Sequence, residues 1–221
     1  MHALLRHLRS QGFECVPEPL AINDGIETLS FLAGESGVDS WAHQHTLEGV
    51  RSAATLLRTV HDASQGWQPP DDAVWGIAAM AEVEVICHGD PGPWNMVWDG
   101  PRAIGLIDWD FAHPGPALDD VAYALEYFVP FRDDQDALEW HHFPEPPERR
   151  SRLGAFVRAY GVADSKGLVD AVIARQEASV DHVRALADSG IQPQRQWVED
   201  GYLDTLAVRV EWSRAHRHLF A

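Results

Sequence analysis

Cysteine and long apolar runs are scarce in this sequence of 221 residues. The two cysteines, Cys15 and Cys87, cannot build the disulfide framework of a small secreted protein, which indicates a reducing compartment. No stretch approaches the length of a membrane-spanning helix, and no apolar core of a signal peptide follows the first residues. We therefore expect a soluble, cytoplasmic protein that does not bind membranes.

Basic residues are also in deficit. Lysine and arginine number 17 against 34 acidic residues, a formal net charge of −17. A surface this acidic repels nucleic acids and anionic membranes, so neither is expected as a partner. The charge could attract a cationic small molecule, or it could only maintain solubility, and both interpretations stay open.

The remaining composition is that of a globular protein. Hydrophobic residues make up 45% of the chain, which suffices for the core of one domain or two small lobes. Nine tryptophans are present, and many fall outside the expected core faces. We expect some of them to line a cleft.

Polar side chains with a chemical role stand out between residues 87 and 110. Asp90 lies in a loop that two prolines and a glycine keep from becoming a helix or a central strand. Two short apolar runs then flank Asp99-Gly100, which predicts a β-hairpin. Because a hairpin folds back on itself, we expect Asn95 and Asp108 to lie close together at its open end.

These residue types suit phosphoryl transfer. Kinases use a carboxylate to hold the attacking hydroxyl, and an asparagine and a second carboxylate to hold Mg²⁺. Their sequence signature is H-x-D-x-x-x-x-N followed by a metal motif that begins with Asp. Residues 88–95 and 108–110 fit the two parts, with Trp-Asp in place of Phe-Gly. The alternative is two unrelated turns, which the order and spacing of both motifs disfavour.

The sequence H-G-D-x-x-x-x-N, followed by I-D-W-D-x-A, resembles the aminoglycoside phosphotransferase and choline kinase family. The resemblance continues through residues 111–122 and is specific only over 88–122. It implies an α+β, protein-kinase-like fold. A reduced N-terminal lobe with the hinge would cover residues 1–33, and a mostly helical C-terminal lobe would cover residues 34–221.

The resemblance also implies a role for each polar residue. Asp90 would orient and deprotonate a substrate hydroxyl, and Asn95 and Asp108 would hold Mg²⁺. Asp110 would assist the metal or the loop, while His88 is expected to brace the loop by hydrogen bonds. The reaction implied is ATP- and Mg²⁺-dependent phosphorylation of a small molecule, aminoglycoside-like or amino-alcohol-like.

The N-terminal lobe departs from the family pattern. Backbone groups of Ser30, Phe31 and Leu32 would meet the adenine of ATP, while the side chains of Phe31 and Leu32 are expected in the strand core. Neither the glycine-rich loop nor the strand lysine of the family precedes the first helix. Either the reading frame is longer or catalysis is altered. A non-catalytic kinase homologue that binds a ligand or partner in the same cleft is therefore an alternative, and a module that binds a cationic small molecule is a weaker one.

Hydrophobic periodicity and turn residues predict the remaining elements. The N-terminal hairpin, which turns at Asn23-Asp24-Gly25, leaves an unpaired edge, so we expect a second copy to cover it in a homodimer. Glu199, Asp200, Asp204 and Glu211 are either amine-binding carboxylates or a solvated helix face. Helices are predicted over 2–11, 44–64, 72–80, 117–128, 147–160, 165–186 (capped by Ser165) and 194–219, strands over 19–22 and 27–32, and a surface loop or lid over 133–147.

Overall fold

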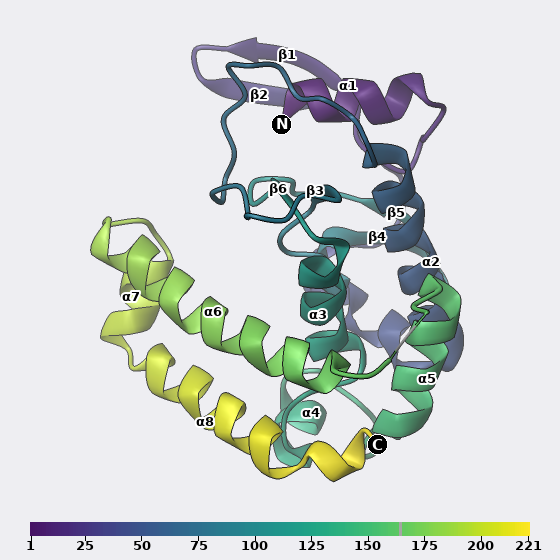
Figure 1. Ribbon diagram of the computed structural model, residues 1–221, viewed down its shortest axis with the longest axis vertical. Helices are drawn as coiled ribbons and strands as arrows, with labels where there is room; N and C mark the ends of the chain where they lie inside the picture. Colours follow the sequence, from purple (N-terminus) through teal and green to yellow (C-terminus); the bar gives the residue numbers. More distant parts are fainter. Residues whose placement is uncertain (164) are drawn as a thin grey trace.

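The computed structural model describes residues 1–163 and 165–221 and shows a mixed α+β protein (Figure 1). The N-terminal part contains α1 (His2–Ser10), β1 (Pro19–Asn23), β2 (Ile26–Leu29), the 3-10 helix η1 (Gly37–His45) and α2 (Leu47–Ser64). The middle part contains β3 (Val85–Cys87), the 3-10 helix η2 (Pro93–Asn95), β4 (Met96–Asp99), β5 (Arg102–Leu106), β6 (His113–Gly115) and α3 (Ala117–Phe128). The last part contains α4 (Asp134–Glu139), α5 (Arg149–Tyr160), α6 (Leu168–Asp188), α7 (Gln194–Glu199), α8 (Tyr202–Ala215) and the 3-10 helix η3 (Arg217–Leu219).

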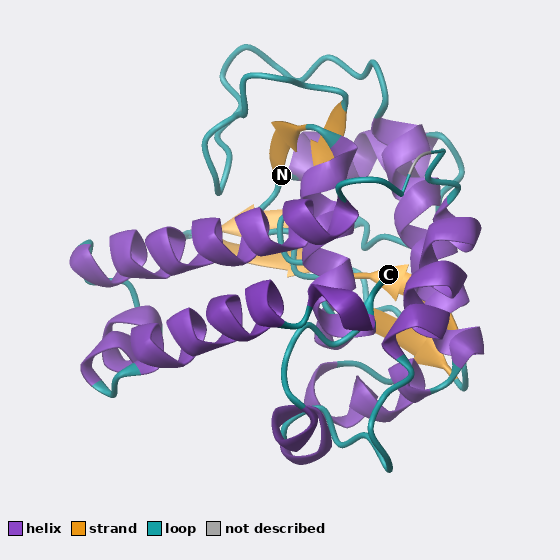
Figure 2. Cartoon of the chain, turned by 60° about the horizontal axis from the view of Figure 1, so that its bottom comes forward, coloured by secondary structure: helices purple, strands orange, loops and turns teal. Residues whose placement is uncertain are grey.

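The strands form three small antiparallel pairs, β1–β2, β3–β6 and β4–β5. The first pair and α1 lie at the top of Figure 1, and the other two pairs lie below them and above α3. Helices α6 and α8 pack together and extend away from the rest of the molecule, joined at their far end by α7 (Figure 2). Among the described residues, no helix is long and apolar enough to cross a membrane.

The core explains why α2 forms. Its apolar residues recur every three or four positions, and Val50, Leu57 and Val60 are almost fully buried. The helix starts at Thr46, whose hydroxyl accepts a hydrogen bond from the Gly49 N–H at 3.0 Å. It packs against α1, α5 and β5, so it fixes the β4–β5 hairpin to the helical part of the chain.

Several predicted elements are confirmed. Helix α1 buries Leu4, Leu5 and Leu8, as its spacing predicts, and α3 has the predicted bounds. The N-terminal hairpin turns at Asp24-Gly25, where both residues have positive φ, as a tight two-residue hairpin turn requires. The Asp99-Gly100 hairpin is also present.

The helix predicted over residues 72–80 is wrong, because this segment is irregular. Its backbone pairs with a neighbouring segment instead. The Gly76 N–H donates to the Ala112 carbonyl at 3.2 Å, and the Met80 N–H donates to the Pro114 carbonyl at 2.9 Å. Gly76 permits this close approach, since a Cβ there would lie 1.7 Å from the carbonyl oxygen of Asp110.

The segment 133–147 is more ordered than predicted. It contains α4, because the Asp133 carboxylate accepts a hydrogen bond from the Asp136 N–H and so caps the helix. Arg149 ties it to α5 through an ion pair with Asp134 at 2.8 Å. His141 is fully buried, so the segment forms part of the packed structure.

The last two predicted helices also require correction. Helix α6 starts after Gly167, which has a φ of 80°, and Ser165 does not cap it. The predicted helix 194–219 is broken at Gly201, whose φ of 87° ends α7 and precedes α8. The Phe31 side chain, expected in the core, is 86% exposed.

Candidate active site

The β4–β5 hairpin brings Asn95 and Asp108 to the same end. Met96 pairs with Leu106, and the Ile107 N–H donates to the Asn95 carbonyl at 2.9 Å. Asp108 follows directly and has a φ of 62°, a left-handed conformation that turns the chain where the strand pairing ends. The two side chains expected to hold Mg²⁺ therefore start from neighbouring backbone positions.

Hydrogen bonds hold one of the two oxygens of the Asp90 carboxylate. Its Oδ2 atom accepts hydrogen bonds from Asn95 Nδ2 at 2.9 Å and from Trp94 Nε1 at 3.3 Å. Asn95 Nδ2 also donates to the Asp90 carbonyl at 2.9 Å. The other oxygen, Oδ1, is buried and has no hydrogen-bond partner among the described residues. This oxygen is available to accept a hydrogen bond from a bound hydroxyl.

Burial raises the pKa of Asp90 above its ordinary value, while the nearby Tyr123 hydroxyl opposes the rise. A carboxylate in these surroundings takes up a proton more readily than one in water. Tyr123 lies on α3 and is itself buried, so its hydroxyl is fixed beside the carboxylate. The combination suits a general base.

His88 braces the loop, as the geometry of its ring shows. Its Nδ1 accepts a hydrogen bond from the Asp90 N–H at 3.2 Å, and its Nε2 donates to the Ile107 carbonyl at 2.9 Å. The ring also packs edge-on against Trp109 at 4.7 Å. His88 thus fixes the segment of Asp90 to the segment of Asp108.

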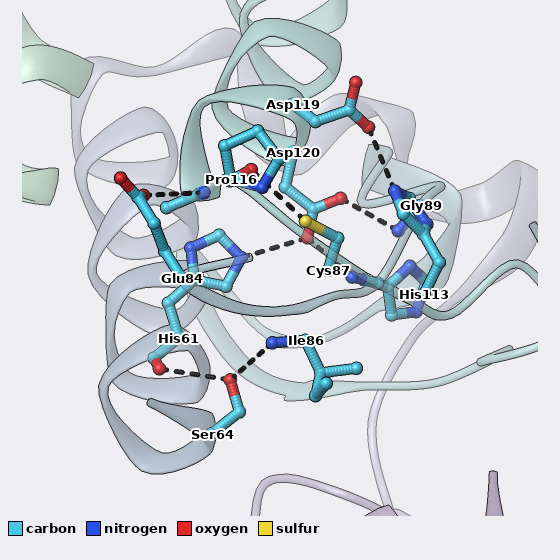
Figure 3. Close-up of polar contacts among 12 residues, drawn as sticks. His61, Ser64, Glu84, Ile86, Cys87, Gly89, His113, Pro116, Asp119 and Asp120 are labelled. Atoms are coloured by element: carbon cyan, nitrogen blue, oxygen red, sulfur yellow. Dashed lines mark hydrogen bonds and ion pairs between the residues drawn. The ribbon is translucent and has the colours of Figure 1, made fainter. Parts of the chain in front are cut away.

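Asp120 lies at the centre of the contacts in Figure 3. Its Oδ2 accepts hydrogen bonds from the backbone N–H of His88 at 2.6 Å and from His61 Nε2 at 3.0 Å, and its Oδ1 accepts one from the Gly89 N–H at 2.8 Å. The carboxylate lies in the first turn of α3 but makes no side-chain cap there. Only the fold shows that two of its partners are in residues 88–95, the loop that carries Asp90 and that we call the catalytic loop, and that the third is on α2.

Arg175 on α6 was not identified from the sequence. Its Nη2 donates to the Gly89 carbonyl at 3.1 Å, and its Nε lies 3.3 Å from Asp119 Oδ1. Its guanidinium also covers the Tyr123 ring at 4.8 Å. Arg175 therefore joins α6, α3 and the catalytic loop, and nothing in its local sequence marks it.

A cavity of about 660 Å³ lies beside Asp90, and we call it the aromatic cavity. Four tryptophans line it, which confirms the expectation that some would line a cleft: Trp41, Trp94, Trp140 and Trp197. Polar, charged and tyrosine side chains also line it: Tyr123, Glu126, Tyr127, Arg132, Asp136, His141, Arg175, Gln176, His182, Gln194, Tyr202 and Arg209.

The four acidic residues considered as amine ligands do not line this cavity. Glu199 pairs with Arg195 at 3.1 Å, and Glu211 pairs with Arg214. Asp200 accepts a hydrogen bond from Gln196. These contacts describe a solvated helix face.

The residues expected at the nucleotide side lie apart from the aromatic cavity. The Ser30 N–H donates to the Glu18 carbonyl at 2.9 Å, while Leu32 lies against Gly105 of β5. Asp110 is exposed, and the desolvation of its carboxyl group, followed by the charge of Asp108, raises its pKa. Within the described part of the chain, no three His, Cys, Asp or Glu side chains group as a metal site, so a bound metal would need further ligands.

Comparisons with known proteins agree with this geometry. The sequence pattern of the phosphotransferase enzyme family matches residues 72–153, which contain the catalytic loop, the hairpin and α3. The trifolitoxin immunity protein of Rhizobium leguminosarum bv. trifolii is 32% identical over 181 residues, which are 77% of this chain and 67% of that protein.

Two solved structures share the fold. A putative aminoglycoside phosphotransferase from Ralstonia eutropha JMP134 superposes with a TM-score of 0.62 at 12% identity, covering 97% of this chain and 83% of that one. The amicoumacin kinase hAmiN, in complex with AMP-PNP, Ca²⁺ and Ami, superposes with a TM-score of 0.58 at 13% identity. The match covers 97% of this chain and 76% of that one. The expected kinase-like fold is confirmed, and the chain belongs to the phosphotransferase enzyme family.

Proposed function

We propose that the protein transfers the γ-phosphoryl group of ATP to a hydroxyl of a small molecule bound in the aromatic cavity. The observation that carries the proposal is the buried Asp90 Oδ1, which lacks a hydrogen-bond partner in a residue that lines this cavity. The structure of the amicoumacin kinase holds an ATP analogue and a divalent cation, which supports the same pair of ligands here.

The residues at the open end of the hairpin fit a Mg²⁺ ion. Mg²⁺ binds through oxygen atoms and usually keeps one or two carboxylates, the phosphates and several waters. The Asn95 amide nitrogen faces Asp90, which leaves the amide oxygen for a cation, and Asp108 supplies a carboxylate. When bound, the ion would neutralise charge on the phosphates.

Asp90 does the proton chemistry in this proposal. Its Oδ1 accepts a hydrogen bond from the substrate hydroxyl and so orients the oxygen toward the γ-phosphorus. The new oxygen–phosphorus bond forms, the bond to the bridging oxygen of ADP breaks, and the hydroxyl proton passes to Asp90. Asn95 and Trp94 hold Oδ2 in place meanwhile, and Tyr123 limits how basic the carboxylate becomes.

The proposed nucleotide site lies where the two lobes of the chain meet. We place the adenine beside the backbone of Ser30, Phe31 and Leu32, between an N-terminal lobe of residues 1–33 and a helical lobe of residues 34–221. These three residues connect the β1–β2 hairpin to the pairing of Glu35 with Trp98 on β4. Any adenine contact there would therefore span the junction of the two lobes.

The test uses nucleotide binding and ADP release together. Saturating Mg·ATP at about 100 times its dissociation constant stabilises a protein by ~2.7 kcal/mol, which raises the Tm of a chain of this size by about 5–10 °C. Asp90→Asn is expected to keep this shift and to lose ADP release, while Asp108→Asn is expected to lose the shift. Asp99→Asn, at an exposed residue on the hairpin turn, is the matched control and should change neither. Absence of the shift in the wild-type protein would contradict the proposal.

A second function is favoured by the relative at 32% identity, which is named an immunity protein. The protein would then protect a cell by binding a toxic small molecule in the aromatic cavity, without turnover. Expression in a strain sensitive to the toxic molecule distinguishes the two functions. If the Asp90→Asn variant still protects the cells, the protein acts by binding alone. Loss of protection in this variant, with a normal Tm, indicates phosphorylation.

We also infer that a second copy covers the β1–β2 hairpin. Ile22, Ile26 and Phe31 are 62%, 71% and 86% exposed there, and exposed apolar strands invite pairing. Light scattering at micromolar concentration should give the mass of a dimer, and Ile26→Lys should give that of a monomer. A monomeric wild-type protein would contradict this inference.

A further inference from the structure

Buried polar atoms that lack a hydrogen-bond partner concentrate around the aromatic cavity. Nine described residues have a buried side-chain nitrogen or oxygen without a hydrogen-bond partner, and eight of them line this cavity. Buried polar groups are normally paired, so such a concentration marks a surface that a ligand completes. The eight residues are Asp90, Arg132, His141, Arg175, Gln176, His182, Gln194 and Arg209.

Two buried arginines at one side of the cavity share one carboxylate. Arg209 Nη1 donates to Glu126 Oε1 at 3.2 Å, whereas Arg132 Nη2 lies 3.6 Å from the same oxygen and makes no hydrogen bond to it. Arg132 and Arg209 are 4% and 9% exposed, and Glu126 is 3% exposed. Glu126 is therefore hydrogen-bonded to Arg209, and among the described residues no carboxylate is hydrogen-bonded to Arg132.

The ionisation of these groups agrees with the contacts. Burial and then the charge of Arg209 lower the pKa of Arg132, while Glu126 raises that of Arg209 against the effect of burial. Burial and the same two arginines lower the pKa of His141, so its ring is neutral. The charge of Asp136, the other acidic residue beside the two arginines, favours their charged forms, but within the described chain Asp136 makes no ion pair with either guanidinium.

We propose that the substrate carries a carboxylate, which binds to Arg132 with Arg209 beside it. The proposal deepens the proposed function, because it defines the acceptor of the same site. A buried guanidinium that shares its one ion-pair partner with a second arginine and makes no hydrogen bond to it is costly, and a planar carboxylate matches its paired N–H groups. The positive charge lies inside a chain whose net charge is −17, so it is a local feature of the cavity.

The rest of the substrate is largely aromatic or apolar in this inference. The Arg132 guanidinium lies over the Tyr127 ring at 5.2 Å, and Tyr127 contacts Trp94 edge-on at 4.6 Å. Trp94 in turn donates to Asp90. Aromatic faces thus connect the proposed carboxylate site to the catalytic carboxylate, and the acceptor must be long enough to reach both.

Calorimetric titration without nucleotide tests the inference with three probes that share one ring system: indole-3-butyrate, indole-3-butyramide and tryptamine. We expect the carboxylate to bind about tenfold or more tightly than the amide, the amine to bind most weakly, and Arg132→Gln to abolish the preference. Arg195→Gln, at an exposed arginine on α7, is the matched control and should keep it.

Glu126→Gln provides a test in the opposite direction. It removes the carboxylate that competes for the two arginines, so the carboxylate probe should bind more tightly than to the wild-type protein. Equal binding of the acid and the amide, or a preference that Arg132→Gln leaves intact, would overturn the inference. Since no nucleotide is present, this result is independent of the Mg·ATP shift that tests phosphoryl transfer.

Discussion

Asp120 Oδ2 lies 2.6 Å from the backbone nitrogen of His88, so a carboxylate on α3 holds the first residue of the catalytic loop. The same carboxylate accepts from the Gly89 N–H and from His61, whose other ring nitrogen lies 2.7 Å from the Tyr160 hydroxyl. Helices α2, α3 and α5 are therefore connected to the loop through one fully buried group. The position of Asp90 depends on this connection.

Asp120→Asn should destabilise the protein by about 2–4 kcal/mol in urea unfolding, because an amide supplies only one acceptor atom for three donors. Asp62→Asn is the control, since Asp62 is half-exposed in an i,i+4 pair with Arg58 and should cost about 0.5 kcal/mol or less. Equal costs for the two variants would show that Asp120 is not a structural anchor.

Stability should fall with rising pH through the titration of His113. Burial opposes its charged form, but hydrogen bonds to Asp119 and to the Phe111 carbonyl prevail and raise its pKa. A raised pKa adds stability that is fully present below the unfolded value of about 6.5 and is lost as the pH rises through the folded value. Urea midpoints measured across this range should fall in the wild-type protein and change less in His113→Gln. If the urea midpoints of both proteins fall equally with pH, a group other than His113 causes the loss of stability.

The acid limb of the pH profile of kcat/KM should follow the ionisation of Asp90. Since its pKa is raised by burial, activity should rise with pH at a value above that of an ordinary aspartate, about 3.9. Tyr123→Phe removes a hydroxyl that lowers this pKa, so it should move the limb to higher pH. A limb that stays in place or moves to lower pH would remove Tyr123 from this role.

Gly89→Ala should destabilise the catalytic loop more than Gly25→Ala destabilises its turn. Both glycines have positive φ, which costs an alanine about 1–2 kcal/mol. Only at Gly89 would the new Cβ meet another atom, 2.3 Å from the Phe111 carbonyl oxygen, whereas Gly25 is open. Unfolding free energies should therefore differ by about 1 kcal/mol or more. If they match, the loop moves freely enough to accept the methyl group.

Thr46→Ala should cost about 1 kcal/mol, because the hydroxyl that caps α2 is lost. Thr55 on the exposed side of the same helix is the control. Its hydroxyl bonds only to the Arg51 carbonyl of the preceding turn, so Thr55→Ala should be neutral or slightly stabilising. Thermal unfolding of the two variants is the measurement. A Thr46→Ala protein as stable as the wild type would show that tertiary packing alone positions α2.

Local patterns predicted the elements whose partners lie nearby in the chain. The spacing of Leu4, Leu5 and Leu8 predicted α1, and Asp99-Gly100 predicted the hairpin that joins Asn95 to the segment of Asp108. The prediction failed at residues 72–80, where the backbone bonds to residues 112 and 114, more than thirty positions away. It also failed at Gly201, because a single positive φ divides a pattern that periodicity treats as continuous.

The order and types of residues from His88 to Asp110 by themselves determined the family and the candidate base and metal ligands, since this chemistry needs those groups at that spacing. The tertiary structure alone decided what surrounds them. Asp120, Arg175 and the arginines of the aromatic cavity meet the site from α3, the segment after it, α6 and α8, and no local signal in the sequence marks the arginines. The physical reason is that burial and charge balance depend on which distant segments pack together, and these decide the pKa of Asp90 and the chemistry of the cavity.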